Sequence, residues 1–343
     1  MQNKKYTATK KNGGVIPKRP VIAKTWFGED VYDDRVLKIE IPCGNCIECC
    51  KQKARNWQIR LNEEIKDENY KYFITLTFAP QELEKLVKET GVGETNAIMT
   101  IAVRRMLEKW RKTHKKSLKH WLITELGHQG TERIHAHGII WSPIPLEVTP
   151  TQDKGMYQWK YWRYGHIYVG EYVSARTVNY IVKYVTKIDT DHKSFRPIIL
   201  TSPGMGKQWI DRMHYYYSYV RGKALDYYVM PNGTKLKLPT YYKNKLYNEE
   251  QREEIWRDFM DKDQEAVMGN IYLNAEENKP TIDRIKDKAC EENTKAGYGN
   301  NTAQWKKKPY NVTLRMLKKG DESANYAYIR KKIFEKFADI NLK

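Results

Sequence analysis

Short runs of alternating apolar and polar residues occupy the middle of the chain, separated by longer stretches whose apolar residues recur with helical spacing. The short runs, rich in β-branched and aromatic residues, predict strands at 71–78, 120–125, 134–141 and 165–171. The longer stretches predict helices at 53–66, 96–116 and 174–187, the last capped by Ser174. This order predicts an α+β fold, a central antiparallel sheet with helices on one side, related to the ferredoxin and RRM arrangement.

Composition divides the chain into three predicted regions. Residues 1–36 are a basic N-terminal arm containing glycine and proline, and residues 37–245 hold the predicted sheet. Residues 246–343 are expected to form a charged, mainly helical C-terminal extension. Within it, 249–292 carries fourteen acidic against seven basic side chains, so this acidic segment is expected to have a task separate from the basic body.

The charge of the chain indicates a polyanionic partner. The formal net charge is +19, and because the acidic segment contributes −7, the rest of the chain carries +26. Lys and Arg gain affinity by releasing counterions from phosphates, and aromatic rings stack on unpaired bases; the chain has 25 Tyr and 10 Trp. Single-stranded nucleic acid is therefore the predicted partner, with a merely basic, tyrosine-rich surface as the alternative.

No membrane partner is expected. The sequence has no run of 18 apolar residues, and the basic stretch 1–24 lacks the apolar core of a secretory signal. The protein is therefore expected to stay in the cytoplasm where it is made.

Two histidines separated by one residue lie on the third predicted strand. Side chains two apart on a strand point to the same face, so His135 and His137 can grip one divalent cation together. The hairpin connection brings Glu125 on the preceding strand close to them as an oxygen ligand. These three residues are the predicted metal ligands; the alternative is a histidine pair that only fills a strand face.

The predicted helix at 174–187 turns two tyrosines and two lysines away from its apolar stripe. At 100° per residue the stripe consists of Val178, Ile181, Val182 and Val185. Tyr180 and Tyr184 are four residues apart, and each is followed three residues later by a lysine, Lys183 or Lys187. An ordinary amphipathic helix is the alternative to a catalytic one.

Together these residues predict phosphoryl transfer through a covalent intermediate. A tyrosine phenol attacks a backbone phosphate and leaves a 5′-phosphotyrosine and a free 3′-hydroxyl, while the metal offsets the growing negative charge. Lys183 or Lys187 would lower the pKa of the phenol or hold the phosphate. No nucleotide is consumed, which agrees with the lack of a P-loop: Thr201 and Gln208 stand where the stretch 203–207 would need Gly and Ser or Thr.

Four of the five cysteines are crowded into eight residues, as Cys43, Cys46, Cys49 and Cys50. In a cytosolic protein such spacing favours a metal over disulfides, and two successive C-x-x-C steps resemble half of a structural zinc site. A set of reduced thiols is the alternative.

Three motifs, in this order along the chain, resemble those of HUH endonucleases: Phe-Ile-Thr-Leu-Thr-Phe at 73–78, His-Ala-His at 135–137, and Tyr-x-x-Lys-Tyr-x-x-Lys at 180–187. The segment 42–49 is similar to the N-terminal motif of replication initiators from microviruses, the gokushovirus-like phages with small circular single-stranded genomes. Segments 203–206 and 239–242 are also similar to theirs, and the resemblance covers about 37–245. Ala136 is smaller than the usual residue there, and Ile134 replaces a frequent Pro, but neither change removes a ligand.

The resemblance implies an HUH endonuclease fold and a rolling-circle replication initiator that nicks the phage origin and later cuts and rejoins the displaced strand. It further implies Mg²⁺ or Mn²⁺ as cofactor, single-stranded and origin DNA as substrates, and the host replication helicase and polymerase as partners in the host bacterial cytoplasm. Two tyrosines suit this cycle, because one can hold DNA while the other attacks.

Three other functions share parts of this pattern. Iron oxygenases also use two histidines and a carboxylate, but with a different spacing, and the tyrosine helix would then have no role. A non-enzymatic, zinc-stabilised single-stranded DNA-binding protein would bind DNA without cutting it. A plasmid initiator or a transposase would share the chemistry, and the cysteine motif favours a phage protein over both.

Overall fold

The structure is a computed structural model of the whole chain. It describes four short strands before residue 40 and most of 44–296, apart from 45, 128–131, 188, 190–191, 193–194, 217–225, 253–254, 256–263 and 275. In this part of the chain no helix is long and apolar enough to cross a membrane. Cys43 and residues 297–343 lie outside the described residues.

A seven-stranded sheet forms the centre of the protein, with the order β11-β6-β7-β5-β10-β9-β8 and antiparallel pairing throughout. The strands are β5 (Tyr70–Leu76), β6 (Lys119–Leu126), β7 (Ile134–Ser142), β8 (Thr149–Pro150), β9 (Met156–Trp159), β10 (Trp162–Gly170) and β11 (Ile199–Thr201). The four predicted strands and the α+β class are confirmed. β8, β9 and β11 are short edge strands that the pattern did not predict.

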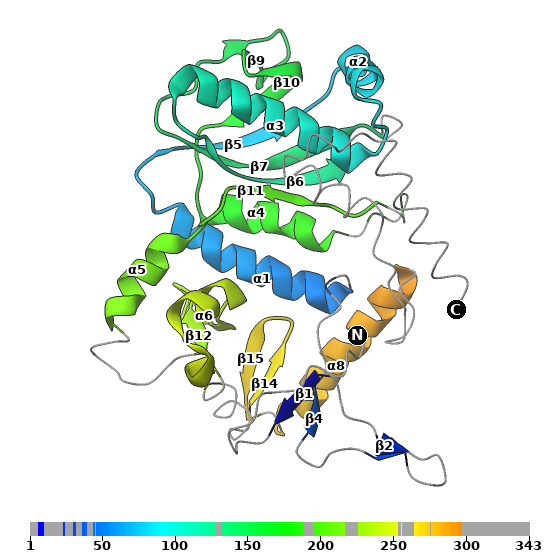
Figure 1. The fold of residues 1–343 in the computed structure, drawn as a ribbon, viewed down its shortest axis with the longest axis vertical. Helices are drawn as coiled ribbons and strands as arrows, with labels where there is room; N and C mark the ends of the chain where they lie inside the picture. The colour runs from blue at the N-terminus through cyan, green and yellow to red at the C-terminus, as the bar shows by residue number, and fades with distance from the viewer. Residues whose placement is uncertain are drawn as a thin grey trace.

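Helices cover both faces of this sheet, which corrects the expectation of helices on one side (Figure 1). They are α1 (Ile47–Glu64), α2 (Pro80–Thr90), α3 (Thr95–His114) and α4 (Ala175–Thr186). Leu122 and Ile140 pack with α2 and α3, whereas their neighbours Ile123 and Ile139 pack with α1 and α4. Because side chains alternate along a strand, apolar residues at consecutive positions bury both faces, and a one-sided sheet would have left one set exposed.

Helix α4 begins where its sequence predicts. Ser174 accepts a hydrogen bond from Arg176 N, and Thr177 Oγ1 accepts one from Ser174 N in return, which makes a capping box. The predicted stripe of Val178, Ile181, Val182 and Val185 is buried against the sheet and α1. The cap and the stripe together set the rotation of α4, so its two tyrosines are turned away from the core.

Helix α1 ends in two buried carboxylates that tie the sheet to the rest of the protein. Glu64 accepts hydrogen bonds from Lys119 Nζ on β6 and from Gly206 N, both at 2.5 Å. Glu63 accepts from Tyr228 Oη and pairs with Arg212. A buried carboxylate is costly unless it is paired, so these contacts hold α1 in one position relative to β6.

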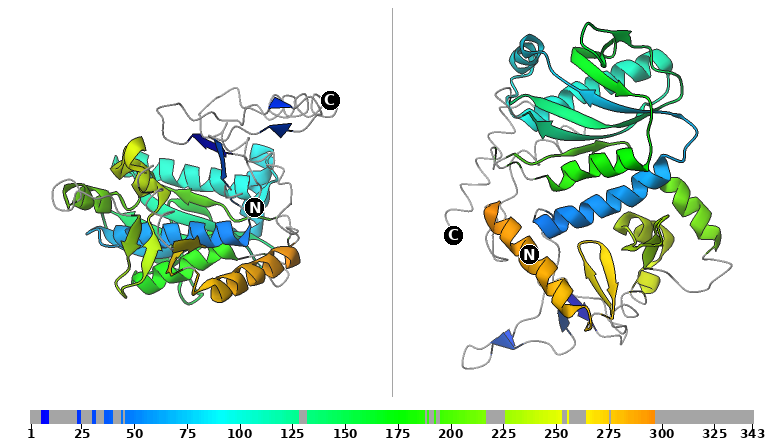
Figure 2. Two further views of the ribbon diagram at one scale, coloured as in Figure 1. Left: turned by 90° about the horizontal axis from the view of Figure 1, so that it is seen from below. Right: turned by 180° about the vertical axis from the view of Figure 1, so that it is seen from behind.

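A second, four-stranded sheet lies on the side of α1 away from the large sheet (Figure 2). Its order is β12-β13-β15-β14, with β12 (Tyr227–Val229), β13 (Lys235–Lys237), β14 (Gln264–Val267) and β15 (Asn270–Leu273). Near it lie the helices α5 (Lys207–Tyr216), α6 (Thr240–Leu246) and α8 (Lys279–Lys295). The boundary expected at residue 245 therefore runs through one sheet, and the predicted helical extension consists of α8 preceded by a hairpin.

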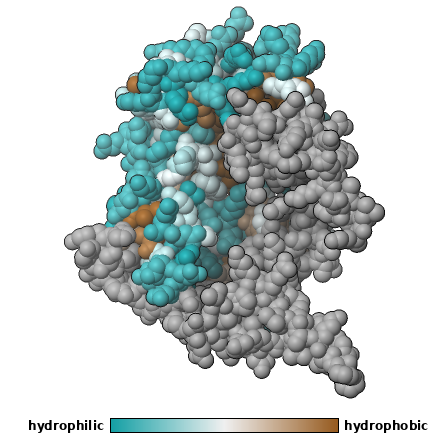
Figure 3. All heavy atoms as spheres, viewed as in Figure 1, coloured by the Kyte–Doolittle hydropathy of each residue, from teal (hydrophilic) through white to brown (hydrophobic). Residues whose placement is uncertain are grey.

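Two pairs of short strands fall within or beside the predicted basic arm. β1 (Tyr6–Thr9) pairs with β4 (Val36–Ile39), and β2 (Ala23–Lys24) pairs with β3 (Asp30–Val31). On the face shown in Figure 3, hydrophilic side chains predominate among the coloured residues, and hydrophobic ones form small patches.

Candidate active site

The antiparallel pairing of β6 and β7 places the three predicted metal ligands on one face of the sheet. Glu125 is directly opposite His135, and His137 follows two residues further along β7, opposite Ile123. Residues opposite each other in a ladder, and residues two apart, share a face. That face is the one covered by α4, because Ile123 and Ile139 pack with its buried stripe.

Glu125 and His137 are in direct contact. His137 Nε2 lies 2.8 Å from Glu125 Oε2, and His137 Nδ1 lies 2.9 Å from Thr75 Oγ1 on β5. An ionised carboxylate only accepts hydrogen bonds, so the neutral imidazole carries its proton on Nε2 and accepts from the Thr75 hydroxyl at Nδ1. Thr75 thereby orients the ring. Sequence reasoning did not assign it a role, although it lies inside the strand motif 73–78.

The electrostatics favour an ionised Glu125 beside neutral imidazoles. Burial by itself raises the pKa of Glu125, but hydrogen bonds from His137 and Lys187 outweigh it and hold the pKa below its ordinary value. Lys187 forms an ion pair with the second carboxylate oxygen. Burial, and then the neighbouring His137, lower the pKa of His135. The charge states are those that a cation-binding site requires.

The predicted ligands fit a divalent cation by donor chemistry. Two imidazoles and a carboxylate suit such an ion. Yet among the described residues no three His, Cys, Asp or Glu side chains converge closely enough to hold one as they stand. Glu125 and His137 bond to each other, and the His135 ring lies parallel to His137 within 17°, with centroids 6.3 Å apart. The three donors are gathered at one place, and their role as ligands stays a prediction.

Both predicted tyrosines of α4 lie next to these donors. The Tyr184 ring stacks on the His137 ring, with centroids 4.8 Å apart and planes within 10°. Tyr180 Oη is 2.6 Å from Tyr184 Oη, so one phenol donates a hydrogen bond to the other. Tyr180 is the more accessible of the two, with 48% of its surface exposed. Two potential nucleophiles therefore stand within one hydrogen bond of each other.

The pKa of Tyr184 is raised, not lowered. Burial is the main cause, and the hydrogen bond with Tyr180 and the charge of Glu125 act in the same direction. Lys187 Nζ is 5.8 Å from the centroid of the Tyr184 ring, but its ion pair is with Glu125. In this structure the lysine therefore does not lower the pKa of the phenol, which was one of the two roles expected of it.

The two predicted lysines are in different surroundings. Lys187 lies at the end of α4 next to Glu125. Lys183 is exposed and lines a groove of about 460 Å³ between α1, α4 and the β14–β15 turn, together with Lys51 and Arg55. The structure therefore brings Lys187 to the tyrosines and His137, and directs Lys183 toward α1.

The cysteine motif lies at the start of α1. Cys46 Sγ is 3.2 Å from Cys49 Sγ, and both side chains are buried, whereas Cys50 is half-buried. Cys43 falls outside the described residues. No group of three metal-binding side chains occurs in the described part of this motif, so the zinc site stays a prediction.

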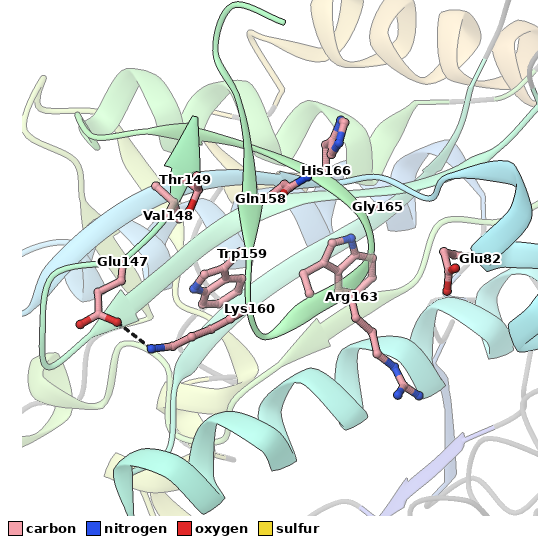
Figure 4. A pocket seen from close by; sticks show the side chains of 11 residues that line it. Glu82, Glu147, Val148, Thr149, Gln158, Trp159, Lys160, Arg163, Gly165 and His166 are labelled. Carbon is pink, nitrogen blue, oxygen red and sulfur yellow. Dashed lines mark hydrogen bonds and ion pairs between the residues drawn. The ribbon is translucent and has the colours of Figure 1, made fainter. Parts of the chain in front are cut away.

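A separate cavity of about 620 Å³ lies at the edge of the sheet, where β8, β9 and β10 meet α2 (Figure 4). In it Lys160 Nζ pairs with Glu147 at 2.7 Å, and Arg163 extends toward a helix. Its lining includes none of the residues predicted for catalysis or metal binding, so the hollow at this edge is distinct from the candidate active site.

Comparison with known proteins agrees with this geometry. Residues 71–189 match the family model described as replication-associated protein ORF2, and this span contains Glu125, both histidines and both tyrosines. The chain is 27% identical over 241 residues to the replication-associated protein VP4 of Bdellovibrio phage phiMH2K, covering 63% of this chain and 72% of that one. It is 24% identical over 172 residues to the replication-associated protein ORF2 of Spiroplasma virus 4, covering 46% of this chain and 51% of that one. No solved structure gives a significant match.

Proposed function

We propose that this protein, which belongs to the replication-associated protein ORF2 family through residues 71–189, initiates rolling-circle replication of a microvirus-like phage. It nicks single-stranded DNA at the phage origin by metal-dependent transesterification, remains attached through a 5′-phosphotyrosine, and rejoins the strand after a round of copying. The host replication helicase and polymerase are its expected partners, because no P-loop is present in the sequence to supply unwinding.

One observation carries the proposal: the Tyr184 ring lies on His137, and His137 contacts Glu125. These residues come from a helix and two strands that are distant in the sequence, and each was singled out by its own local pattern. A helix that was amphipathic only for packing would not need its polar face aligned with the donor set. The arrangement supports a tyrosine nucleophile beside a site for the phosphate.

The proposed reaction exchanges one phosphodiester for another. The Oη of Tyr180 or Tyr184 forms a bond to phosphorus, the bond from phosphorus to the 3′ oxygen breaks, and the released oxygen takes up a proton to become a 3′-hydroxyl. The phenol gives up its proton, so the protons balance and no nucleotide is consumed. Because the product is again an ester, the reverse reaction with a new 3′-hydroxyl rejoins the strand.

The residues have separate tasks in this step. Glu125, His135 and His137 would hold Mg²⁺ or Mn²⁺, which supplies polarisation of the phosphate when bound. Thr75 orients the His137 ring through Nδ1. Lys187, between Glu125 and the Tyr184 ring, is placed to contact a phosphate oxygen brought to the phenols. The hydrogen bond between the two phenols means that either can reach a phosphate held at the other.

The experiment is incubation with labelled single-stranded circular phage DNA, in Mn²⁺ or in EDTA, followed by a denaturing protein gel. A nuclease-resistant protein–DNA adduct that needs Mn²⁺ is expected, and it should disappear in the Tyr180→Phe/Tyr184→Phe variant. Tyr70→Phe is the matched control, since Tyr70 is an exposed tyrosine at the other end of β5. DNA binding without any adduct or nick would overturn the enzymatic proposal in favour of a single-stranded DNA-binding protein.

A further inference from the structure

We propose that Tyr168 on β10 is a stacking platform that binds an unpaired base of the DNA strand entering the candidate active site. The inference rests on the proposed function for its role in nicking. Its binding claim can be tested without nicking.

Tyr168 lies in line with the candidate active site across the sheet. It is paired with Thr75 on β5, and Thr75 is paired with His137 on β7. Directly paired residues of neighbouring strands share a face, so Tyr168 is on the same face as His137, two strands away. Neighbouring strands are about 4.8 Å apart, which puts the two Cα atoms roughly 10 Å from each other. This is the scale of one or two nucleotides.

The Tyr168 ring is held in place although its outer part is open. It makes an edge contact with Phe73, with centroids 6.0 Å apart and planes at 68°. A Cβ added at Gly155 would lie only 3.2 Å from the ring, and one at Gly170 would lie 3.6 Å from it. Despite these neighbours 41% of Tyr168 is exposed. An aromatic ring that is both fixed and accessible loses little conformational entropy when a base stacks on it.

A continuous series of aromatic rings joins Tyr168 to the predicted nucleophiles. Phe73 contacts Tyr180 with centroids 5.9 Å apart, and Tyr180 contacts Tyr184 at 5.5 Å. Tyr184 then stacks on His137. The two exposed members of the series, Tyr168 and Tyr180, are separated only by Phe73. A base stacked on Tyr168 would therefore hold the adjoining phosphate near Tyr180.

The chemistry of this surface fits single-stranded rather than paired DNA. An exposed tyrosine face stacks on any base, but only when the base is not enclosed in a duplex. Arg176 is exposed in the first turn of α4, four residues before Tyr180, and therefore on the same side of that helix. It offers a cation for the sugar-phosphate backbone beside the rings. Ring and cation together are the pattern of a sequence-tolerant single-strand site.

The test measures binding in EDTA, so that cutting does not interfere, with a single-stranded origin oligonucleotide carrying 2-aminopurine near the nick site. We expect Tyr168→Leu, which retains an apolar contact with Phe73, to weaken binding at least about fivefold and to reduce the stacking-induced quenching of 2-aminopurine. Tyr168→Phe, which retains the ring, should bind like the unsubstituted protein. Tyr70→Leu is the matched control: Tyr70 is also exposed on the sheet, but its even position on β5 puts it on the opposite face.

The outcomes separate this inference from the proposed function. Unchanged affinity and quenching in Tyr168→Leu, with its melting temperature retained, would overturn the inference even if the protein forms a covalent adduct. Weaker binding in Tyr168→Leu but not in Tyr168→Phe or Tyr70→Leu would support it even if no adduct forms. An equal loss in Tyr70→Leu would also overturn it, because the effect would then not be specific to this face.

Discussion

The ring of Tyr184 lies flat on the imidazole of His137, with centroids 4.8 Å apart and planes within 10°. One residue comes from the fourth helix and the other from the middle of the sheet. The contact places a phenol beside a predicted metal ligand, and it explains why burial is the main cause of the raised pKa of Tyr184. The same phenol bonds to Tyr180 Oη at 2.6 Å, so the two tyrosines act as a pair.

The pair predicts unequal single substitutions. Tyr184→Phe keeps the stacked ring on His137 but removes the phenol, and Tyr180→Phe leaves the stacked phenol in place. We expect each single variant to retain part of the adduct formation, and the double variant to lose roughly 10³-fold or more. Rates of adduct formation on origin-bearing single-stranded DNA, read from denaturing gels, test this. A single variant as inactive as the double would mean that only one tyrosine can attack.

Thr75→Val tests the orientation of His137. The substitution removes the hydroxyl at Nδ1 while nearly preserving side-chain volume on β5. Partners that orient a metal-binding histidine typically contribute 10- to 100-fold in metal affinity or activity, so we expect a loss of about that size in Mn²⁺ binding, measured by calorimetry. Thr113→Val, on the exposed side of α3, is the control and should bind Mn²⁺ normally. Equal Mn²⁺ affinity in Thr75→Val and the unsubstituted protein would show that Thr75 does not support a metal ligand.

Gly206→Ala should destabilise the junction between α1 and α6. Gly206 has φ of +74°, and an added Cβ would lie 2.5 Å from Tyr242 Oη and 2.8 Å from Arg60 O. Gly204 has nearly the same φ, +77°, with nothing within 4 Å of an added Cβ. Both alanine variants therefore carry the backbone strain of the left-handed region, on the order of 1 kcal/mol, and Gly206→Ala adds a steric clash. Urea titration should find Gly206→Ala the less stable of the two, and equal stabilities would contradict the tight packing.

His120 predicts a pH dependence of stability. Burial lowers its pKa, and the hydrogen bond to Leu118 O offsets this only in part. The folded chain therefore takes up the proton at a lower pH than the unfolded chain, whose imidazole has a pKa of about 6.5. The free energy of unfolding should fall as the pH drops below about 6.5, because protons then bind the unfolded chain preferentially, and the fall should level off below the folded pKa.

The matched variant is His120→Gln, which keeps a polar side chain but cannot titrate. Its stability should change less than that of the unsubstituted protein between pH 8 and pH 5, measured by urea unfolding at each pH. Parallel curves for the two proteins would show that His120 does not contribute to the pH dependence.

Local periodicity in the sequence determined the strands around the candidate active site and the helix beside them. A period of two in β7 was enough to put His135 and His137 on one face, and a period of 3.6 in α4 was enough to separate its buried valines from Tyr180 and Tyr184. These patterns depend only on the geometry of each element. They were therefore readable without knowing how the elements pack.

Only the tertiary structure decided how the elements face each other. Whether helices cover one or both faces depends on burial summed over distant segments, and the expectation of one covered face was wrong. Lys183 and Lys187 share a side of α4, yet one lies toward α1 and the other at Glu125, because the neighbours of a helix are not encoded in its own period. Thr75 and Tyr168 came into line with His137 through the register of three strands. Register is a property of paired strands, so no single segment of the sequence contains it.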